Sequence, residues 1–384
     1  MPSTRRDLLA AFGLSVTLSG CLAPTTTDDG LGTVEGEWRM DGRDAGHTRA
    51  VSQGPVEPET VWRRTLEDVR GVGSPASAED RLYVPADAVS EDARSRYRLY
   101  ALAPGTGSTR WQVPLRAEPN GSPAVEGDRV IVSAKRSLER GRVVCFSRRY
   151  GDEEWLYDVD SRLTAPPVVA QGVAYVADWS GTVHAVSVRS GEPRWRRRIE
   201  ADGAGRTFAG PVAVHDGTLY LGSHSGSTGL VALDARTGEE QWRVSTGAVT
   251  VGPVVDDGLV VVQSYGLVEA FDTDGDRRWS FNVPEESAYP IAVGNERVYV
   301  SGRQGLQAVT RDGNRAWRVD GVSGTPTVVG DAVFVRGEGR LSAFDAADGS
   351  ERWAVHQRGS GDAIVLENAV FLSDGARLSG LGQG

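Results

Sequence analysis

The sequence predicts an all-β protein built as an eight-bladed β-propeller. Seven times along the chain a glycine precedes a tryptophan by four residues, and the marker tryptophans are 36 to 49 residues apart. This period is typical of blades of four short strands, and such blades stack into a ring because one blade cannot bury both of its faces. The tryptophans that mark the blades are Trp62, Trp111, Trp155, Trp195, Trp242, Trp279, Trp317 and Trp353.

The order of segments within each repeat predicts strands joined by tight turns. A segment that begins with proline, such as Gly210-Pro211-Val212, is followed by a Gly/Asp turn, two apolar runs and the tryptophan strand. The alternation of apolar and polar residues predicts strands. Because proline removes no hydrogen bond at the edge of a sheet, we expect the proline-led strand to be innermost and to line the central channel. The tryptophans are expected to pack between neighbouring blades.

The two ends of the chain are expected to form the eighth blade together. Trp62 has no glycine turn ahead of it, whereas the C-terminus offers three apolar runs after Trp353 and no further tryptophan. Pairing the strand at 60–66 with these C-terminal strands closes the ring and removes exposed sheet edges.

The repeat resembles a known family. The runs Leu219-Tyr220-Leu221-Gly222-Ser223 and Leu230 to Trp242 are similar to the PQQ-like repeat of quinoprotein alcohol dehydrogenases and BamB-type lipoproteins. The resemblance extends over nearly all of the chain from Trp38 onward and implies a propeller at 38–384. It does not select a function, because this fold carries both enzymes and binding scaffolds.

Residues 1–21 resemble a twin-arginine lipoprotein signal. Arg5 and Arg6 precede an apolar stretch that is too short to span a bilayer, and Leu18-Ser19-Gly20-Cys21 looks like a lipobox. We expect Cys21 to be lipidated and residues 22–37 to form a flexible tether. The protein would then be exported and anchored to the outer face of the cytoplasmic membrane. The alternative is an ordinary signal peptide that is cleaved nearby, with Cys21 incidental.

The chain lacks the features that the quinoprotein resemblance would require for catalysis. In those enzymes the cofactor lies between a tryptophan and a disulfide of adjacent cysteines, beside a calcium ion. Cys21 and Cys145 are the only cysteines here, and the five histidines have no metal-ligand spacing. The sequence therefore predicts no catalytic residue and no metal site, and its motifs do not support PQQ or calcium, although both remain open with the quinoprotein alternative.

Strand order predicts where a partner would bind. The connections between blades and the loops between the second and third strands of each blade share one face, the loop face. The short turns between first and second and between third and fourth strands share the opposite turn face. The loop face has the long, variable loops, which commonly carry function. Aromatic and arginine side chains dominate binding hot spots. The candidates on the loop face are Trp179, Arg206, Phe208, Tyr97, Tyr265, Tyr289, Arg303, Arg336, Lys135, Arg136 and Arg140.

Two functions remain open. The first is a non-enzymatic, lipid-anchored scaffold similar to BamB-type lipoproteins, a monomeric ring that binds an unidentified envelope protein. In that family the partner is the outer-membrane assembly machinery. The alternative is a PQQ-dependent, quinoprotein-like oxidoreductase. A net charge of -10 argues against a nucleic-acid partner.

Overall fold

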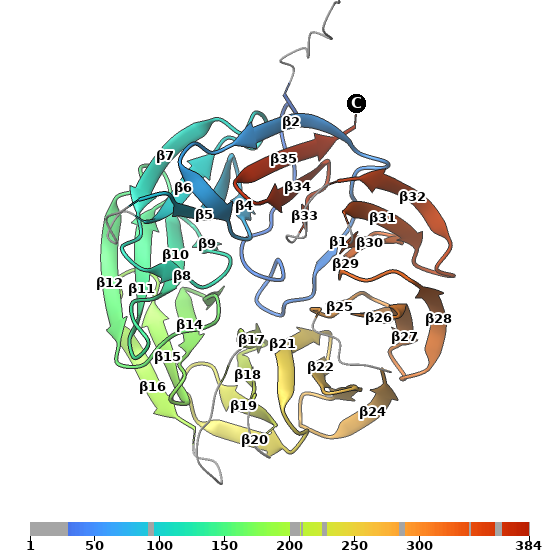
Figure 1. Ribbon diagram of the computed structural model, residues 1–384. Helices are drawn as coiled ribbons and strands as arrows, with labels where there is room; N and C mark the ends of the chain where they lie inside the picture. The colour runs from blue at the N-terminus through green and yellow to red at the C-terminus, as the bar shows by residue number, and fades with distance from the viewer. Residues whose placement is uncertain are drawn as a thin grey trace, which may run out of the picture.

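The protein is a ring of eight sheets around a central channel, as the sequence predicted (Figure 1). The computed structural model describes residues 30–90, 96–199, 208, 210–224, 229–283, 289–337, 339–357 and 363–383. Within these ranges every regular element is a strand, and none of them contains an apolar helix long enough to cross a membrane. Arg5, Arg6 and Cys21, which carry the predicted export signal and lipid anchor, lie outside the described residues.

Blades 1 to 4 follow one another along the chain. Blade 1 contains β3 (Val69–Val72), β4 (Ala76–Ala78), β5 (Arg81–Ala88), β6 (Tyr97–Leu102) and β7 (Thr109–Pro114). Blade 2 contains β8 (Glu118–Pro119), β9 (Ala124–Glu126), β10 (Arg129–Lys135), β11 (Gly141–Ser147) and β12 (Glu153–Val159). Blade 3 contains β13 (Val168–Ala170), β14 (Val173–Ala177), β15 (Thr182–Ser187) and β16 (Pro193–Arg198). Blade 4 contains β17 (Ala213–His215), β18 (Thr218–Gly222), β19 (Leu230–Asp234) and β20 (Glu240–Val244).

Blades 5 to 7 continue this order, and blade 8 is shared between the two ends of the chain. Blade 5 contains β21 (Val249–Asp256), β22 (Leu259–Ser264), β23 (Leu267–Phe271) and β24 (Arg277–Asn282). Blade 6 contains β25 (Ala292–Val293), β26 (Arg297–Gly302), β27 (Gly305–Thr310) and β28 (Arg315–Asp320). Blade 7 contains β1 (Ala50–Val51), β29 (Thr325–Val329), β30 (Ala332–Gly337), β31 (Arg340–Asp345) and β32 (Glu351–His356). Blade 8 contains β33 (Ala363–Val365), β34 (Ala369–Asp374), β35 (Arg377–Gly382) and β2 (Glu59–Thr65).

The ring closes where β2 pairs with β35, and Figure 1 shows the blue N-terminal strand beside the red C-terminal one. The antiparallel register joins Glu59 to Gly382 and Thr65 to Arg377. Because residues from opposite ends of the chain complete one sheet, the ring has no open edge at its seam.

The glycine and the tryptophan of successive repeats meet between blades. The Trp155 indole N–H donates to the carbonyl oxygen of Val188 at 2.9 Å, and a Cβ added to Gly191 would lie 2.6 Å from the Trp155 ring. The same glycine contact recurs for each of the other blade-marker tryptophans from Trp62 to Trp317. In blade 8 the third strand, β35, is C-terminal and the fourth strand, β2, is N-terminal. Because the chain does not connect these two strands, blade 8 has no turn between them to contact Trp353. The missing glycine before Trp62 is thus a consequence of ring closure.

Residues 38–51, the channel segment, run through the turn-face end of the central channel, which Figure 1 shows as blue chain crossing the ring. Carbonyl oxygens of the segment accept backbone N–H groups from the inner strands of blades 1, 2, 4, 5, 6 and 7 at 2.7–2.9 Å. The donors are Ser77, Val125, Val214, Val255, Val293, Val328 and Gly330. In blade 7 the proline-led strand β29 is therefore not innermost, because β1 pairs with it in parallel from the channel side.

Buried polar side chains hold the channel segment. His47 is 5% exposed, and its ring nitrogens lie 2.8 Å from the carbonyl oxygens of Asp41 and Val212. Both partners only accept hydrogen bonds, so a ring nitrogen that carries a proton donates to its carbonyl oxygen. The guanidinium of Arg49, 3% exposed, donates to the carbonyl oxygen of Pro326 at 3.2 Å and lies 5.4 Å from the centre of the Trp38 ring.

Residues 30–37, which belong to the predicted tether, lie against blades 1 and 8. The N–H of Leu31 donates to the carbonyl oxygen of Gly105 at 2.9 Å, and the N–H of Glu35 donates to the side chain of Asn368 at 2.9 Å. Both contacts lie on the turn face, so the described chain reaches the channel from that side.

Candidate functional site

Four exposed apolar side chains lie at loop tips on the loop face. Val89, Leu138, Trp179 and Tyr265 lie in the loops between the second and third strands of blades 1, 2, 3 and 5, and are 55%, 75%, 37% and 59% exposed. Apolar groups held in water favour contact with a partner when they share a surface. The loop face thus presents several such groups in loops that paired strands support.

Trp179 is held in place by its own turn and by the neighbouring connection between blades. The backbone N–H of Trp179 donates to the backbone carbonyl oxygen of Arg162 at 2.9 Å. The guanidinium of Arg162 lies 3.6 Å from the centre of the indole ring. A cation stacked on an aromatic face restrains both side chains. Trp179 is therefore a preorganised contact, with part of its ring left in solvent.

Asp178 organises the turn beneath Trp179. Its Oδ1 accepts from the N–H of Ser180 at 2.8 Å, the hydroxyl of Ser180 at 2.7 Å and the N–H of Thr182 at 3.0 Å. Burial alone would raise the pKa of Asp178, but the hydrogen bonds from His184, Thr182 and Ser180 outweigh it and hold that pKa below its usual value. The carboxylate is therefore the form that the turn stabilises.

His184 connects this carboxylate to the adjacent blade. Its Nε2 lies 3.1 Å from Oδ2 of Asp178, and its Nδ1 lies 3.0 Å from the hydroxyl of Tyr157 on β12. With Asp178 ionised, Nε2 carries the proton, and in a neutral ring the hydroxyl of Tyr157 then donates to Nδ1. The chain of contacts borders a cavity of about 370 Å³ between blades 2 and 3.

Most of the other predicted loop-face residues reach solvent. Tyr265 is largely exposed, Arg303, Arg136 and Arg140 are exposed, and Tyr289 is half-buried. Several are already paired: Nζ of Lys135 lies 3.2 Å from Glu118, Arg136 lies 3.5 Å from Asp158, and Arg96 lies over the ring of half-buried Tyr97. The structure spreads these residues around the ring and does not bring them into one cluster.

Three predicted residues differ from the rest. Phe208 is 1% exposed because it packs into the core shared by blades 2, 3 and 4. Arg336 is 4% exposed, and its guanidinium donates to the carbonyl oxygen of Gln357 at 2.6 Å. Both were expected on the binding surface, and burial removes them from it. Arg206 lies outside the described residues.

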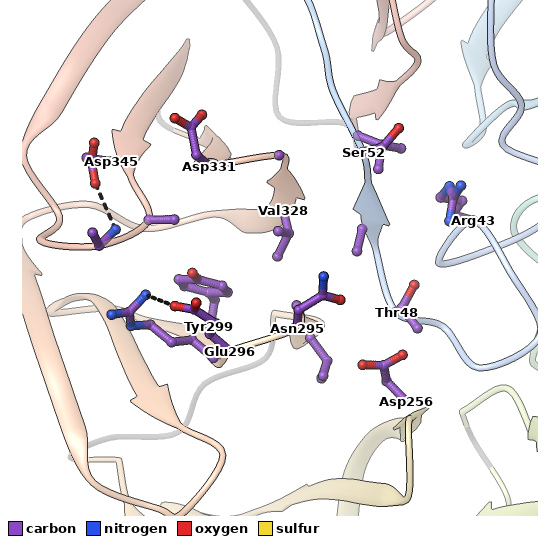
Figure 2. Close-up of a pocket in the computed structure, with 18 of the residues that line it drawn as sticks. Arg43, Thr48, Ser52, Asp256, Asn295, Glu296, Tyr299, Val328, Asp331 and Asp345 are labelled. Carbon is purple, nitrogen blue, oxygen red and sulfur yellow. Dashed lines mark hydrogen bonds and ion pairs between the residues drawn. The ribbon is translucent and has the colours of Figure 1, made fainter.

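A larger cavity, of about 830 Å³, lies on the turn face beside the channel segment. Figure 2 shows Thr48 of that segment, Asp256 and Asn295 close together, with Asp331 and Asp345 on the blade 7 side. The acidic groups are largely paired, since Asp256 accepts from Arg311 at 2.9 Å and Asp331 and Asp345 both accept from Arg352 at 2.8 Å. The larger of these two cavities therefore lies opposite the face that the sequence favoured.

The residues present do not fit a quinoprotein cofactor site. Cys145 lies in β11, is fully buried, and has its pKa raised by burial to about 12, so it is an inert thiol with no neighbouring cysteine in the sequence. In the part of the chain that the structure describes, no three His, Cys, Asp or Glu side chains gather into a metal site.

The sequence interpretation missed the channel segment, the Arg162–Trp179 stack and the exposed Leu138. The first two depend on contacts between segments distant along the chain. Leu138 is an apolar residue in the polar run Lys135 to Arg142, which was a usable signal.

The chain is similar to two kinds of known protein, BamB proteins and quinohemoprotein alcohol dehydrogenases. A family model described as outer membrane protein assembly factor BamB matches residues 49–264, 179–289 and 264–379. BamB of Burkholderia pseudomallei is 25% identical over 332 residues, which span 83% of this chain and 75% of that protein. A quinohemoprotein alcohol dehydrogenase of Comamonas testosteroni is 34% identical over 162 residues, but these span 36% of this chain and only 22% of the enzyme.

Solved structures agree on the fold. BamB from Moraxella catarrhalis superposes with a TM-score of 0.67 at 18% identity, and the match covers 85% of this chain and 98% of that one. At this identity the likeness shows the propeller alone. The family match, in contrast, extends over nearly the whole ring, and the chain belongs to the family described as outer membrane protein assembly factor BamB.

Proposed function

We propose that the protein is a non-enzymatic scaffold that binds another envelope protein through the loop face. The observation that carries the proposal is Trp179, an exposed indole that Arg162 fixes at the tip of blade 3. Preorganised aromatic groups contribute strongly to binding because little conformational entropy is lost when they are covered. The match to the BamB family supports a role in assembly at the envelope.

We further propose that the ring is exported and held at the outer face of the cytoplasmic membrane by a lipid on Cys21. The signal-like residues Arg5 and Arg6 and the lipobox before Cys21 support this proposal. Metabolic labelling with radioactive palmitate should mark the wild type and leave Cys21→Ala unlabelled, and Cys21→Ala should appear in the soluble exported fraction. Unchanged membrane retention of Cys21→Ala would remove the lipid anchor from the proposal.

The scaffold proposal is tested by crosslinking in cells. A photoreactive residue at position 138 should trap one defined protein, and Trp179→Ala in the same chain should reduce the yield about tenfold. Tyr150→Ala is the matched control, because Tyr150 is an aromatic residue 62% exposed on the turn face. Equal yields in the two variants would contradict a loop-face partner.

The quinoprotein alternative has one observation in its favour, the 34% identity to an alcohol dehydrogenase over 162 residues. Calorimetric titration of the purified protein with PQQ and calcium should give no saturable heat, because Cys145 offers no disulfide and is buried. Saturable binding together with dye-linked alcohol oxidation would establish the enzyme instead.

A further inference from the structure

The outer strand of blade 3 differs from the equivalent strands of the other blades. On this strand Arg194 directly precedes Trp195, Arg196 directly follows it, and Arg198 lies three residues after it. None of the other seven tryptophan strands has more than one arginine at these three positions. In a chain whose net charge is -10, this concentration of positive charge is local to one blade.

The strand pairing fixes which way these arginines face. In the β15–β16 register Arg196 lies opposite His184 and Arg198 lies opposite Thr182, and directly opposed residues share one face of a sheet. The ring of His184 contacts Tyr157 of blade 2. Arg196 and Arg198 therefore face the groove between β12 and β16, where they line the cavity of about 370 Å³.

Arg196 and Arg198 also lack an ion pair among the described residues, unlike several arginines on the other outer strands. On the other outer strands, Arg243, Arg278, Arg318 and Arg352 each contact a carboxylate at 2.5–3.0 Å. Neither Arg196 nor Arg198 forms an ion pair or a hydrogen bond with its side chain to any residue that the structure describes. The groove carries positive charge that the fold leaves available.

The acidic groups along the same groove do not neutralise it. Asp158 lies 2.9 Å from Arg142 and 3.5 Å from Arg136, so two arginines already offset its single negative charge. Asp178 is buried beneath His184 and fully hydrogen-bonded. Asp160 is the remaining exposed acid that lines the cavity.

The backbone of β16 is free as well, because β16 is the edge strand of its sheet and pairs only with β15 among the described strands. An extended peptide can pair with such an edge and place alternate side chains on one side of the sheet. Side chains two residues apart along a strand are separated by about 6.6–6.8 Å, the spacing that also relates Arg196 to Arg198.

We propose that the groove between β12 and β16 binds an extended acidic segment of a partner protein. Carboxylates at alternate positions of the segment pair with Arg196 and Arg198, and its backbone adds to the edge of β16. This assignment rests on the proposed scaffold function and names the chemistry of one partner segment.

The test uses the exported chain and a synthetic probe, an acetylated ten-residue peptide of alternating Glu and Thr labelled with fluorescein. Binding is measured by fluorescence anisotropy, beside a peptide with Gln in place of Glu. We expect the Glu peptide to bind about tenfold more tightly, and the difference to shrink at high salt. Equal binding of the two peptides overturns the proposal.

Two double variants locate the site. R196Q/R198Q should weaken binding of the Glu peptide about tenfold, whereas R64Q/R110Q, which removes the same charge from exposed positions on β2 and β7, should leave it unchanged. Matching thermal unfolding curves show that both variants are folded. A loss in both variants, or in neither, contradicts the groove.

A control with lipid vesicles tests whether the groove binds anionic lipid headgroups instead of an acidic peptide. The vesicles contain phosphatidylglycerol and phosphatidylcholine. If they bind the wild type but not R196Q/R198Q, and the Glu peptide does not bind, the groove is a lipid headgroup site and the proposal is overturned. Failure here is distinct from failure of the scaffold proposal, because R196Q/R198Q leaves Trp179 in place and the crosslink at position 138 is tested through Trp179→Ala.

Discussion

The two faces of the ring use the same scaffold in opposite ways. On the turn face, short repeated turns surround a channel that residues 38–51 fill through backbone hydrogen bonds to six blades. On the loop face, the connections between the second and third strands leave Leu138, Trp179 and Tyr265 exposed at their tips. The difference indicates that the turn face contributes closure and stability, whereas the loop face is available for recognition.

Tryptophan shows the contrast most directly. Trp38 of the channel segment is 2% exposed, and its backbone forms two hydrogen bonds of 2.8 Å with Ser77 of blade 1. Trp179 on the loop face is 37% exposed and restrained by one cation stack. The same residue type therefore serves packing on one side of the ring and is left available on the other.

The largest expected effect comes from replacing these two residues in the same way. Trp38→Ala should lower the free energy of unfolding by about 3–5 kcal/mol, because it leaves a cavity in a packed core. Trp179→Ala should cost below about 1 kcal/mol. Chemical denaturation followed by circular dichroism measures both. Similar losses for the two variants would break the distinction between the faces.

A second, intermediate effect tests whether the loop face has a rigid foundation. Asp178→Asn should lower the free energy of unfolding by about 1–3 kcal/mol at pH 7, because it removes the charge that His184, Thr182 and Ser180 stabilise. Trp179→Ala in the same assay is the control for loss of the exposed ring alone.

The pH dependence of this effect follows from the direction of the shift. The folded state lowers the pKa of Asp178, so its stabilisation is complete above about pH 4, the unfolded value, and is lost as the pH falls through the folded pKa. The wild type should therefore lose more stability than Asp178→Asn between pH 6 and pH 3. Parallel pH profiles for the two proteins would show that Asp178 is not the group responsible.

Features that repeat along the chain could be predicted from sequence. Blades and ring closure were predictable because each depends on local patterns, the glycine turn before each tryptophan and its absence before Trp62. The pairing of Gly191 with Trp155 repeats one contact around the ring, so one period in the sequence reports many contacts.

Features without periodicity could not be predicted. The channel segment reads as an irregular lead-in, because its structure depends on backbone bonds to residues such as Val214 and Val328, far along the chain. Phe208 and Arg336 were interpreted as surface residues because position beside a loop does not reveal burial. Arg162 lies in the connection between blades 2 and 3, whereas Trp179 lies in a loop within blade 3. The sequence around either residue therefore does not predict that their side chains stack.

The smallest expected effect concerns the acidic wall of the turn-face cavity. The side chain of Asp331 is 86% exposed and pairs with Arg352 at 2.8 Å. Exposed ion pairs contribute less than about 1 kcal/mol and are screened by salt, so Asp331→Asn should change the free energy of unfolding only slightly, and not at all in 1 M NaCl. Differential scanning calorimetry at low and high salt measures the difference. A loss as large as that of Asp178→Asn would mean that this wall is under structural constraint, and the turn face would then contain an organised polar site of its own. A negligible loss leaves the energetic contrast intact: the turn face is held by buried backbone contacts of the channel segment, and its surface charges contribute little to stability.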